Sequence, residues 1–328
     1  MLARADSSGS PGRSAASSPA FPAWARPEKP PVSEAEAAFC AGAALARLDG
    51  IVRENPPFAG ALRKRLALRA AAACVTRSGR AEDEGALRDA VQFTRSGADP
   101  GPAGRQLLAW RALTSGSAGH WRSGVAVAAE ALLVPQDEAL EEAIEAANAC
   151  AESARAAPFA AAQTFALVRR ALASGAGRSL GGRGGEGELL AACLADSVLA
   201  QKLNWPFVPP LLAAASFAGS GRRSTGAARE GDETTHILSA YAHAAAQACD
   251  LAAELDRRAQ KLREVAPRLR AKGAGAALQA LLDDDCLSAA TRIKGISERG
   301  ARRLFERLVA LGALRELTGR KTFRLYGL

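Results

Sequence analysis

Apolar side chains recur every three or four residues along most of the chain, which is the spacing that one face of an α-helix requires. The first such segment follows Ser33, whose hydroxyl is suited to cap a helix that opens with Glu34 and Glu36. Breaks rich in Gly, Pro and polar residues separate the later segments. The pattern predicts helices over residues 57–76, 81–93, 102–110, 121–134, 136–155, 158–173, 188–203 and 234–264.

The composition supports a mainly α-helical protein. Apolar residues make up 48% of the chain, but only 5% of residues are aromatic, and alanine is abundant. Alanine lets helices pack closely and is a poor strand former. The six cysteines are far apart without a Cys-x-x-Cys pair, which is typical of buried, reduced thiols in a cytosolic protein. An apolar run of about 18 residues is missing, so we expect no membrane span and a cytoplasmic location.

Positive charge is concentrated at one end of the chain. Residues 286–328 contain ten Lys and Arg against three Asp and Glu, whereas the other residues are nearly balanced and the whole chain carries +9. Arginine outnumbers lysine throughout, so its abundance alone says little. Its concentration in one short segment is typical of a nucleic-acid-binding module.

The pattern within this basic end predicts a winged helix-turn-helix over residues 274–328. A first helix is expected over 275–283 and a short second helix over 289–293. Gly295 allows the turn, because it adopts backbone conformations that other residues resist. A third helix then follows over 298–311.

Two short strands after the third helix would form a β-hairpin, the wing. They are expected over 314–317 and 322–326. Alternation along the second strand places Phe323 and Leu325 on one face and Arg324 and Tyr326 on the other.

The third helix is amphipathic. Its buried face is expected to consist of Ala301, Leu304, Phe305 and Leu308. The opposite face and the tip of the hairpin carry the candidate DNA-binding residues, which are Arg299, Arg302, Arg303, Arg307, Arg320 and Lys321. An exposed helix fits the major groove, where arginine reaches guanine O6 and N7, and a basic tip reaches phosphates. Glu306 shares this face, where it would either contact cytosine or repel phosphate.

The helix over 234–264 carries a heptad pattern with small or apolar residues at its a and d positions. These residues are Leu238, Tyr241, Ala245, Ala248, Ala252, Leu255, Ala259 and Leu262. The partner helix is expected within the chain, as in a bundle. A homodimer through residues 238–262 is the alternative, because helix-turn-helix proteins often bind DNA as two-fold pairs.

These patterns divide the chain into five segments. The first is too rich in Ser, Pro and Gly to form a core, although Phe21 and Trp24 could dock locally. The segments are a disordered tail over 1–32, an all-helical domain over 33–217, a linker over 218–233, a long helix over 234–267 and the winged helix-turn-helix over 274–328.

The sequence contains no catalytic or metal-binding motif, so we expect no enzyme activity, no cofactor and no metal ion. The glycine-rich stretch 174–187 lacks the Gly-Lys-Ser/Thr of a phosphate loop and follows no strand pattern, which favours a linker. His236 and His243 are seven residues apart, whereas zinc ligands on one helix are usually three or four apart.

Several stretches resemble one bacterial family. The ending ISERGARRLFERLVALGALRELTGRKTFRLYGL, with LLDDDCLSAATRIKG before it, and the upstream stretches DPGPAGRQLLAWR, GGEGELLAACLADSVLAQKLNWPF and REGDETTHILSAYA are similar to an alphaproteobacterial family catalogued as domain of unknown function 1403. The resemblance covers nearly the whole chain. It implies a bacterial setting and no particular activity.

The ending LGALRELTGRKTFRLY also resembles the winged helix at the C-terminus of many Fic-type AMP-transferases. Their His-Pro-Phe…Gly-Asn-Gly-Arg active-site loop has no counterpart in this chain. This second likeness therefore implies a winged helix alone and no transferase activity.

Together these observations predict a DNA-binding protein, a regulator of transcription located on the nucleoid. Its helical body would sense a ligand, bind a partner or mediate oligomerisation. One alternative is an adaptor whose winged helix docks a protein partner and whose arginines are only solvated. A second is an enzyme of unrecognised type built in the helical bundle.

Overall fold

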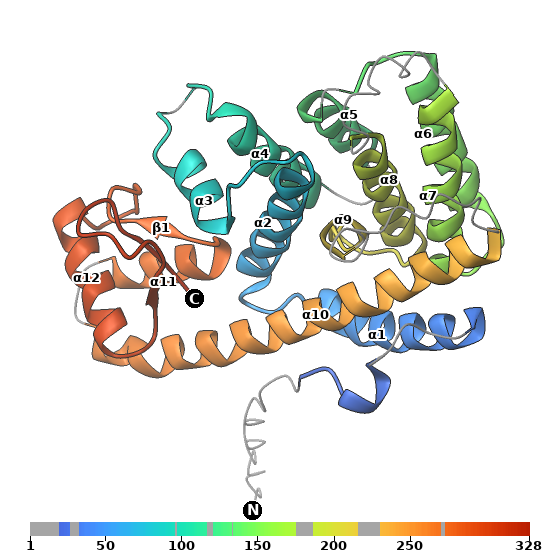
Figure 1. Ribbon diagram of the computed structural model, residues 1–328. Helices are drawn as coiled ribbons and strands as arrows, with labels where there is room; N and C mark the ends of the chain where they lie inside the picture. Colours follow the sequence, from blue (N-terminus) through green and yellow to red (C-terminus); the bar gives the residue numbers. More distant parts are fainter. Residues whose placement is uncertain are drawn as a thin grey trace, which may run out of the picture.

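The computed structural model describes residues 20–26, 33–95, 97–116, 121–132, 134–174, 186–215, 230–269 and 273–328. This part of the chain is mainly helical, as predicted, with a small antiparallel sheet at its C-terminal end (Figure 1). The helices are η1 (Ala23–Ala25), α1 (Glu34–Glu54), α2 (Ala59–Arg77), α3 (Glu84–Gln92), α4 (Gly101–Ser115), α5 (Trp121–Ala131), α6 (Glu138–Glu152), α7 (Ala157–Ser174), α8 (Glu186–Lys202), α9 (Leu212–Ala215), α10 (Glu230–Val265), η4 (Ala266–Arg268), α11 (Ala274–Asp283) and α12 (Glu298–Ala310). The strands are β1 (Leu287–Ser288), β2 (Arg315–Glu316) and β3 (Leu325–Gly327).

Side-chain caps set where several helices begin. The Ser33 hydroxyl accepts a hydrogen bond from the backbone N–H of Glu36 at 3.2 Å, which confirms the predicted cap. Asp83 and Asp137 cap α3 and α6 in the same way. Because Asp83 satisfies an N–H of the first turn, α3 begins after it and not at residue 81.

Helix α10 runs along one whole side of the molecule, with α1 beside it (Figure 1). It contains 36 residues, which corresponds to about 54 Å at 1.5 Å per residue. All eight predicted heptad positions are buried. Helices of the same chain pack against α10, chiefly α1, and also α2, α7 and α9. The seam is therefore confirmed with a partner inside the chain. A homodimer through residues 238–262 has no support, because packing within the chain already buries the seam.

Residues 273–328, here called the C-terminal unit, combine α11, α12 and a three-stranded sheet in the order β1-β3-β2. Leu287 pairs with Tyr326 and Arg315 pairs with Gly327, both in antiparallel register. The sequence predicted only the hairpin, and β1 is the strand that it missed. The two hairpin strands are also shorter than predicted.

The second helix predicted over 289–293 is wrong, because this segment forms a turn. The backbone N–H of Thr291 donates to the Ser288 carbonyl at 3.1 Å, and the Thr291 hydroxyl accepts from the N–H of Ser288 at 3.1 Å. Local bonds of this kind compete with helical ones. Gly295 does form a turn, with φ of +83°, and it packs closely against Gly273.

A buried ion cluster joins the C-terminal unit to the helical body. Asp285, fully buried just before β1, accepts hydrogen bonds from Arg65 of α2 and from Arg88 of α3, the latter at 2.6 Å. Burial alone would raise the pKa of Asp285, but the two guanidinium groups outweigh it and hold the pKa below its usual range. Close by, Gly60 lets α2 approach the backbone of Asp283, which a Cβ at this position would meet at 2.6 Å. One continuous core therefore spans the body and the C-terminal unit.

Other predicted segments are described only in part. Residues 20–26 of the expected tail dock on α10, where Asp250 accepts from the Phe21 N–H at 3.2 Å and pairs with Arg26 at 2.6 Å. Residues 230–233 of the expected linker belong to α10. The rest of both segments, and most of the glycine-rich stretch 174–187, lie outside the described residues. Among the helices that are described, none has the length and apolarity to span a membrane.

Replacing Asp285 by Asn should lower the free energy of unfolding by about 3–5 kcal/mol, because two buried guanidinium groups would lose their counter-charge. Urea-induced unfolding measures this loss. The matched control is Asp283→Asn, at an exposed carboxylate that accepts from Gln279 at 3.1 Å, where we expect a change within about 0.5 kcal/mol. Equal losses for the two variants would contradict a special role for Asp285.

Candidate nucleic-acid interface

Helix α12 is held so that one face lies in the core and the other in solvent. Ser297 caps it, its hydroxyl accepting from the N–H of Gly300 at 3.2 Å. The four predicted core residues, Ala301, Leu304, Phe305 and Leu308, are all buried. The Phe305 ring lies 5.2 Å from the ring of Tyr326 in β3. The predicted orientation of α12 is therefore confirmed.

The arginines predicted on the other face are all exposed. Arg302 forms an ion pair with Glu298 at 3.1 Å, one turn earlier in the helix. Exposed pairs of this kind contribute about 0–1 kcal/mol, so Arg302 can exchange its partner readily. Within the described part of the chain, Arg299, Arg303 and Arg307 have no ion pair. Three guanidinium groups on α12 are thus free to contact an anionic partner.

The loop between β2 and β3, residues 317–324, differs from the projecting wing that the sequence suggested. Arg320 forms an ion pair with Asp89 of α3, which holds the tip of this loop against the body. The Arg324 Nε donates to the Arg320 carbonyl at 2.9 Å. Lys321 is exposed. Of the two cations predicted at the tip, one is engaged with the body and the other faces solvent.

The alternation predicted for the second strand is wrong at Phe323. Phe323 was expected on the same face as Leu325, but Phe323 is exposed and Leu325 is buried. The cause is the backbone of Phe323, whose φ of +54° interrupts the extended strand. Tyr326 is buried against Phe305, which is compatible with the opposite face predicted for it, because both sides of β3 can be covered.

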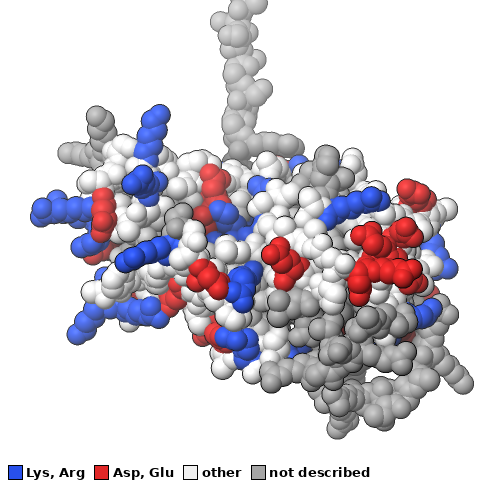
Figure 2. Space-filling view, turned by 90° about the horizontal axis from the view of Figure 1, so that it is seen from above, with Lys and Arg blue, Asp and Glu red and all other residues white. Residues whose placement is uncertain are grey.

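The structure adds two cations that sequence reasoning missed. Arg292 and Lys294 are exposed before α12. Arg292 lies in the segment that was expected to be helical, and Lys294 lies in the predicted turn. Together with α12 and Lys321 they make one end of the molecule basic, and Figure 2 shows Lys and Arg side chains gathered at this end. Asp and Glu side chains gather at the opposite end of the same view, where α6 lies in Figure 1. The exposed carboxylates of α6 are Glu138, Glu141, Glu142, Glu145 and Glu152.

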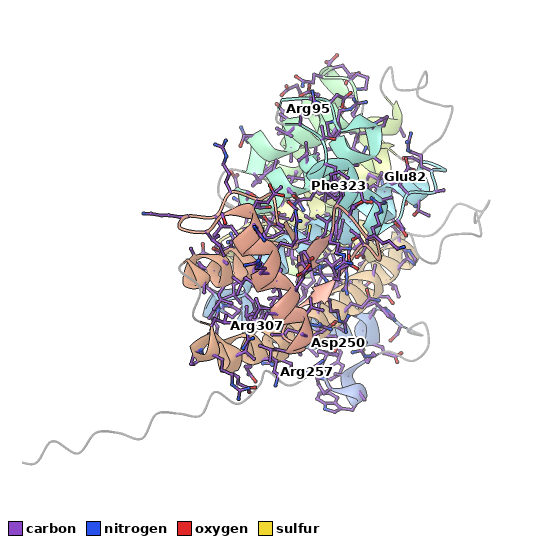
Figure 3. All side chains as sticks on the ribbon, turned by 90° about the vertical axis from the view of Figure 1, so that its left-hand side faces the viewer. Glu82, Arg95, Asp250, Arg257, Arg307 and Phe323 are labelled. Carbon is purple, nitrogen blue, oxygen red and sulfur yellow. The ribbon has the colours of Figure 1, made fainter. Side chains whose placement is uncertain are left out.

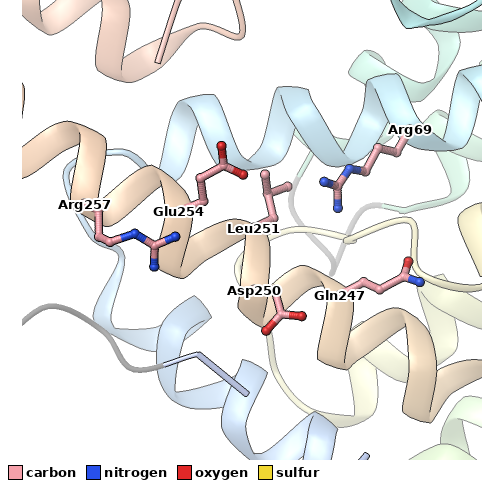
Figure 4. A pocket seen from close by; sticks show the side chains of 6 residues that line it. All are labelled: Arg69, Gln247, Asp250, Leu251, Glu254 and Arg257. Atoms are coloured by element: carbon pink, nitrogen blue, oxygen red, sulfur yellow. The ribbon is translucent and has the colours of Figure 1, made fainter. Parts of the chain in front are cut away.

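A groove of about 400 Å³ lies between α2 and α10 (Figure 4). Its lining residues are Arg69, Gln247, Asp250, Leu251, Glu254 and Arg257. Both carboxylates are engaged by cations of the chain itself, since Asp250 pairs with Arg26 and Glu254 pairs with Arg258 at 2.7 Å. Charges of both signs alternate around the groove, and its lining includes no histidine, cysteine or serine. The lining of the groove therefore contains no nucleophile with a neighbouring histidine.

The buried polar groups of the body serve packing. Asp196 accepts from the N–H of Leu212 at 3.0 Å, at the first residue of α9, and burial raises its pKa to about 8. Burial, with the nearby Asp196 charge, raises the pKa of Tyr241 well above its ordinary value. All six cysteines are buried, as predicted, and burial raises the pKa of Cys74 to about 12, which keeps this thiol unreactive.

Histidines of the described chain lie apart from any metal-ligand set. The ring Nδ1 of His243 contacts the Ser239 carbonyl at 2.9 Å within α10. Over the described ranges, no three His, Cys, Asp or Glu side chains come together in a way that could hold a metal ion. The exposed cations of the C-terminal unit therefore remain the best-formed candidate site.

Comparison with known proteins identifies a family. The family described as "Protein of unknown function (DUF1403)" matches residues 12–328. The chain belongs to this family, as the resemblance of its sequence indicated. No curated protein is similar enough to match. These comparisons do not show the predicted likeness between the end of the chain and the winged helices of Fic-type proteins.

Replacing Asp196 by Asn should change how stability depends on pH. The pKa of Asp196 is about 8 in the folded protein and about 4 when unfolded, so its stabilising contribution is present below pH about 4 and is lost as pH rises towards 8. Asparagine does not ionise. Asp196→Asn should therefore gain stability over the wild type between pH 5 and 8, by up to about 1.4 kcal/mol per pH unit.

Urea-induced unfolding across this pH range measures the difference. Glu152→Gln, at an exposed carboxylate, is the matched control and should follow the wild type. Parallel curves for the wild type and Asp196→Asn would show that burial does not keep this carboxyl neutral.

Proposed function

We propose that this member of the DUF1403 family binds double-stranded DNA through the exposed face of α12. The observation that carries the proposal is that Arg299, Arg303 and Arg307 face solvent opposite a fully buried face of the same helix. Duplex DNA presents a continuous line of phosphates and an accessible major groove, and arginine suits both.

The dimensions of α12 fit this partner. Its 13 residues correspond to about 20 Å, and a helix with its side chains is about as wide as the major groove. The turn before α12 contributes Arg292 and Lys294, which are placed beside the helix N-terminus in the sequence and can contact phosphates. Glu306 also lies exposed on α12, so the face is not uniformly basic.

We interpret the C-terminal unit as a winged helix whose second helix is reduced to a turn. The order α11, β1, turn, α12, β2 and β3 and the pairing of β3 with both other strands support this interpretation. In this hypothesis α12 is the helix that enters the groove. The loop over 317–324, held to α3 through Arg320, would then lie along the backbone of the DNA.

The charge distribution supports one orientation on DNA. The basic C-terminal unit and the acidic face of α6 occupy opposite ends of the molecule (Figure 2). Phosphates attract the first and repel the second, so the body would extend away from the duplex. This arrangement suits a regulator of transcription, with the body left free to contact other molecules.

The combined substitutions Arg299→Ala, Arg303→Ala and Arg307→Ala should weaken duplex binding at least tenfold at low salt. If the three arginines contact phosphates, the slope of log affinity against log salt should fall by up to about 2.7. Fluorescence anisotropy with a labelled blunt duplex measures both. The matched control removes the same charge from three exposed arginines of the helical body, Arg122, Arg155 and Arg170, and should bind much as the wild type.

Absence of duplex binding at low salt, or equal affinity for the α12 variant and the wild type, would refute the proposal. A protein partner that stays bound after DNase treatment and is lost with the α12 substitutions would point instead to the adaptor hypothesis.

A further inference from the structure

Two phenylalanines meet on the surface where the loop over 317–324 touches the body. Phe323 is 75% exposed and Phe93, at the end of α3, is 37% exposed. Their ring centroids are 5.8 Å apart and the planes are inclined at 74°, an edge-to-face pair. Aromatic side chains are ordinarily buried for the free energy that this provides. A pair that stays on the surface is therefore a candidate contact site.

The loop holds Phe323 in place firmly. The Glu316 carboxylate accepts from the N–H groups of Thr318 and Gly319 at 2.8 and 2.9 Å. At the other side, Arg320 pairs with Asp89 and its carbonyl accepts from Arg324. Hydrogen bonds before Phe323 and an ion pair with α3 thus restrain the loop that carries its ring.

The backbone of Phe323 is strained as well. Its φ of +54° is a left-handed conformation, which bulky residues rarely adopt. Strain of this kind persists where the surrounding contacts impose it, and it is concentrated at functional sites. Here its effect is to turn the ring out of the strand and towards solvent.

The surroundings of the pair are basic. Arg95 follows Phe93 by two residues, Lys321 precedes Phe323 by two, and both are exposed. In the view of Figure 3, Phe323 lies between the labelled Arg95 and Arg307 of α12. Exposed aromatic rings with flanking cations are the combination that binds unpaired nucleic acid, since bases stack on the rings while the cations contact phosphates. If this surface bound a protein partner instead, that partner would need acidic residues around its contact site. The two phenylalanines would also have to belong to a broader apolar surface.

We propose that Phe323 and Phe93 form a platform on which an unpaired base stacks next to the duplex held by α12. This inference rests on the proposed function and narrows it. The favoured substrate is duplex DNA with a single-stranded extension, or a duplex opened beside the binding site. Every base has a face that can stack. The protein should therefore prefer DNA with unpaired bases over fully paired DNA, whatever the base sequence.

The test compares a blunt duplex with the same duplex carrying a short oligothymidine extension at either end. For the wild type, the extension should raise the affinity about 5- to 150-fold, the range expected for one stacked base. Phe323→Ala should lose this gain, measured as the ratio of its affinities for the extended and the blunt duplex. Phe323→Tyr should keep the gain.

The matched control is Phe39→Ala, at an exposed phenylalanine of α1, which should behave as the wild type. Thermal unfolding checks that each variant is folded.

A second measurement reports the stacking directly. In Phe323→Trp, fluorescence of the added tryptophan should be quenched by the extended duplex and not by the blunt one, after subtraction of the signal of the wild type.

The possible outcomes separate the two proposals. If the blunt duplex binds but the extension adds nothing, the platform is wrong and duplex binding stands. If oligothymidine alone binds in a Phe323-dependent manner while the blunt duplex does not bind, α12 is not a duplex reader and the aromatic pair still binds unpaired bases. If neither nucleic acid binds, both proposals are overturned.

Discussion

The placement of the basic end depends on one buried carboxylate. Asp285 receives a guanidinium group from α2 and another from α3, and β1 begins two residues after it. Through β1 the same residue fixes the sheet, and the sheet supports the buried face of α12 through Tyr326 and Phe305. Removing the carboxylate would leave two largely buried cations without compensation, which is strongly destabilising.

Small side chains allow the rest of the structure to close around this cluster. Alanine at the heptad positions of α10 lets neighbouring helices of the same chain cover a helix of 36 residues. Glycine performs a similar role at the C-terminal unit. Gly60 permits α2 to meet the backbone of Asp283, and Gly327 lies where a Cβ would meet the Asp285 carbonyl at 2.5 Å. Backbone segments of α2 and β3 therefore pack closely against the residues around Asp285, where the ion cluster forms.

Local signals made most of the helices predictable. The Ser33 cap, the heptad pattern of α10 and the amphipathic period of α12 each involve residues within a few turns of one another. The arginines of α12 were predicted for the same reason. The helical spacing of the apolar residues alone identifies the buried face and therefore places the arginines on the exposed one. The sequence thus predicted the core of the candidate site.

What the sequence did not predict depends mostly on distant partners. Strand β1 exists because Leu287 pairs with Tyr326 much later in the chain. The turn over 289–293 is different, because local hydrogen bonds between Ser288 and Thr291 form it. Arg320 was expected at the tip of the hairpin as a candidate DNA contact, and its ion pair with Asp89, 231 residues away, was not predicted. The exposure of Phe323 follows from a left-handed backbone that no alternation rule indicates. Contacts between residues so far apart produce no periodic pattern of apolar and polar residues in the sequence, so they could not be predicted from it.

The separation between Arg65 and Asp285 also bears on how quickly the protein folds. These residues are 220 positions apart, so closing the ion cluster orders a very long loop. Loop-closure entropy and the high contact order that such pairs create slow folding more than they reduce final stability. The packing of α1 against α10 and the pairing of Arg26 with Asp250 join residues about as far apart in the sequence, so we expect slow folding for the helical body and for the C-terminal unit alike.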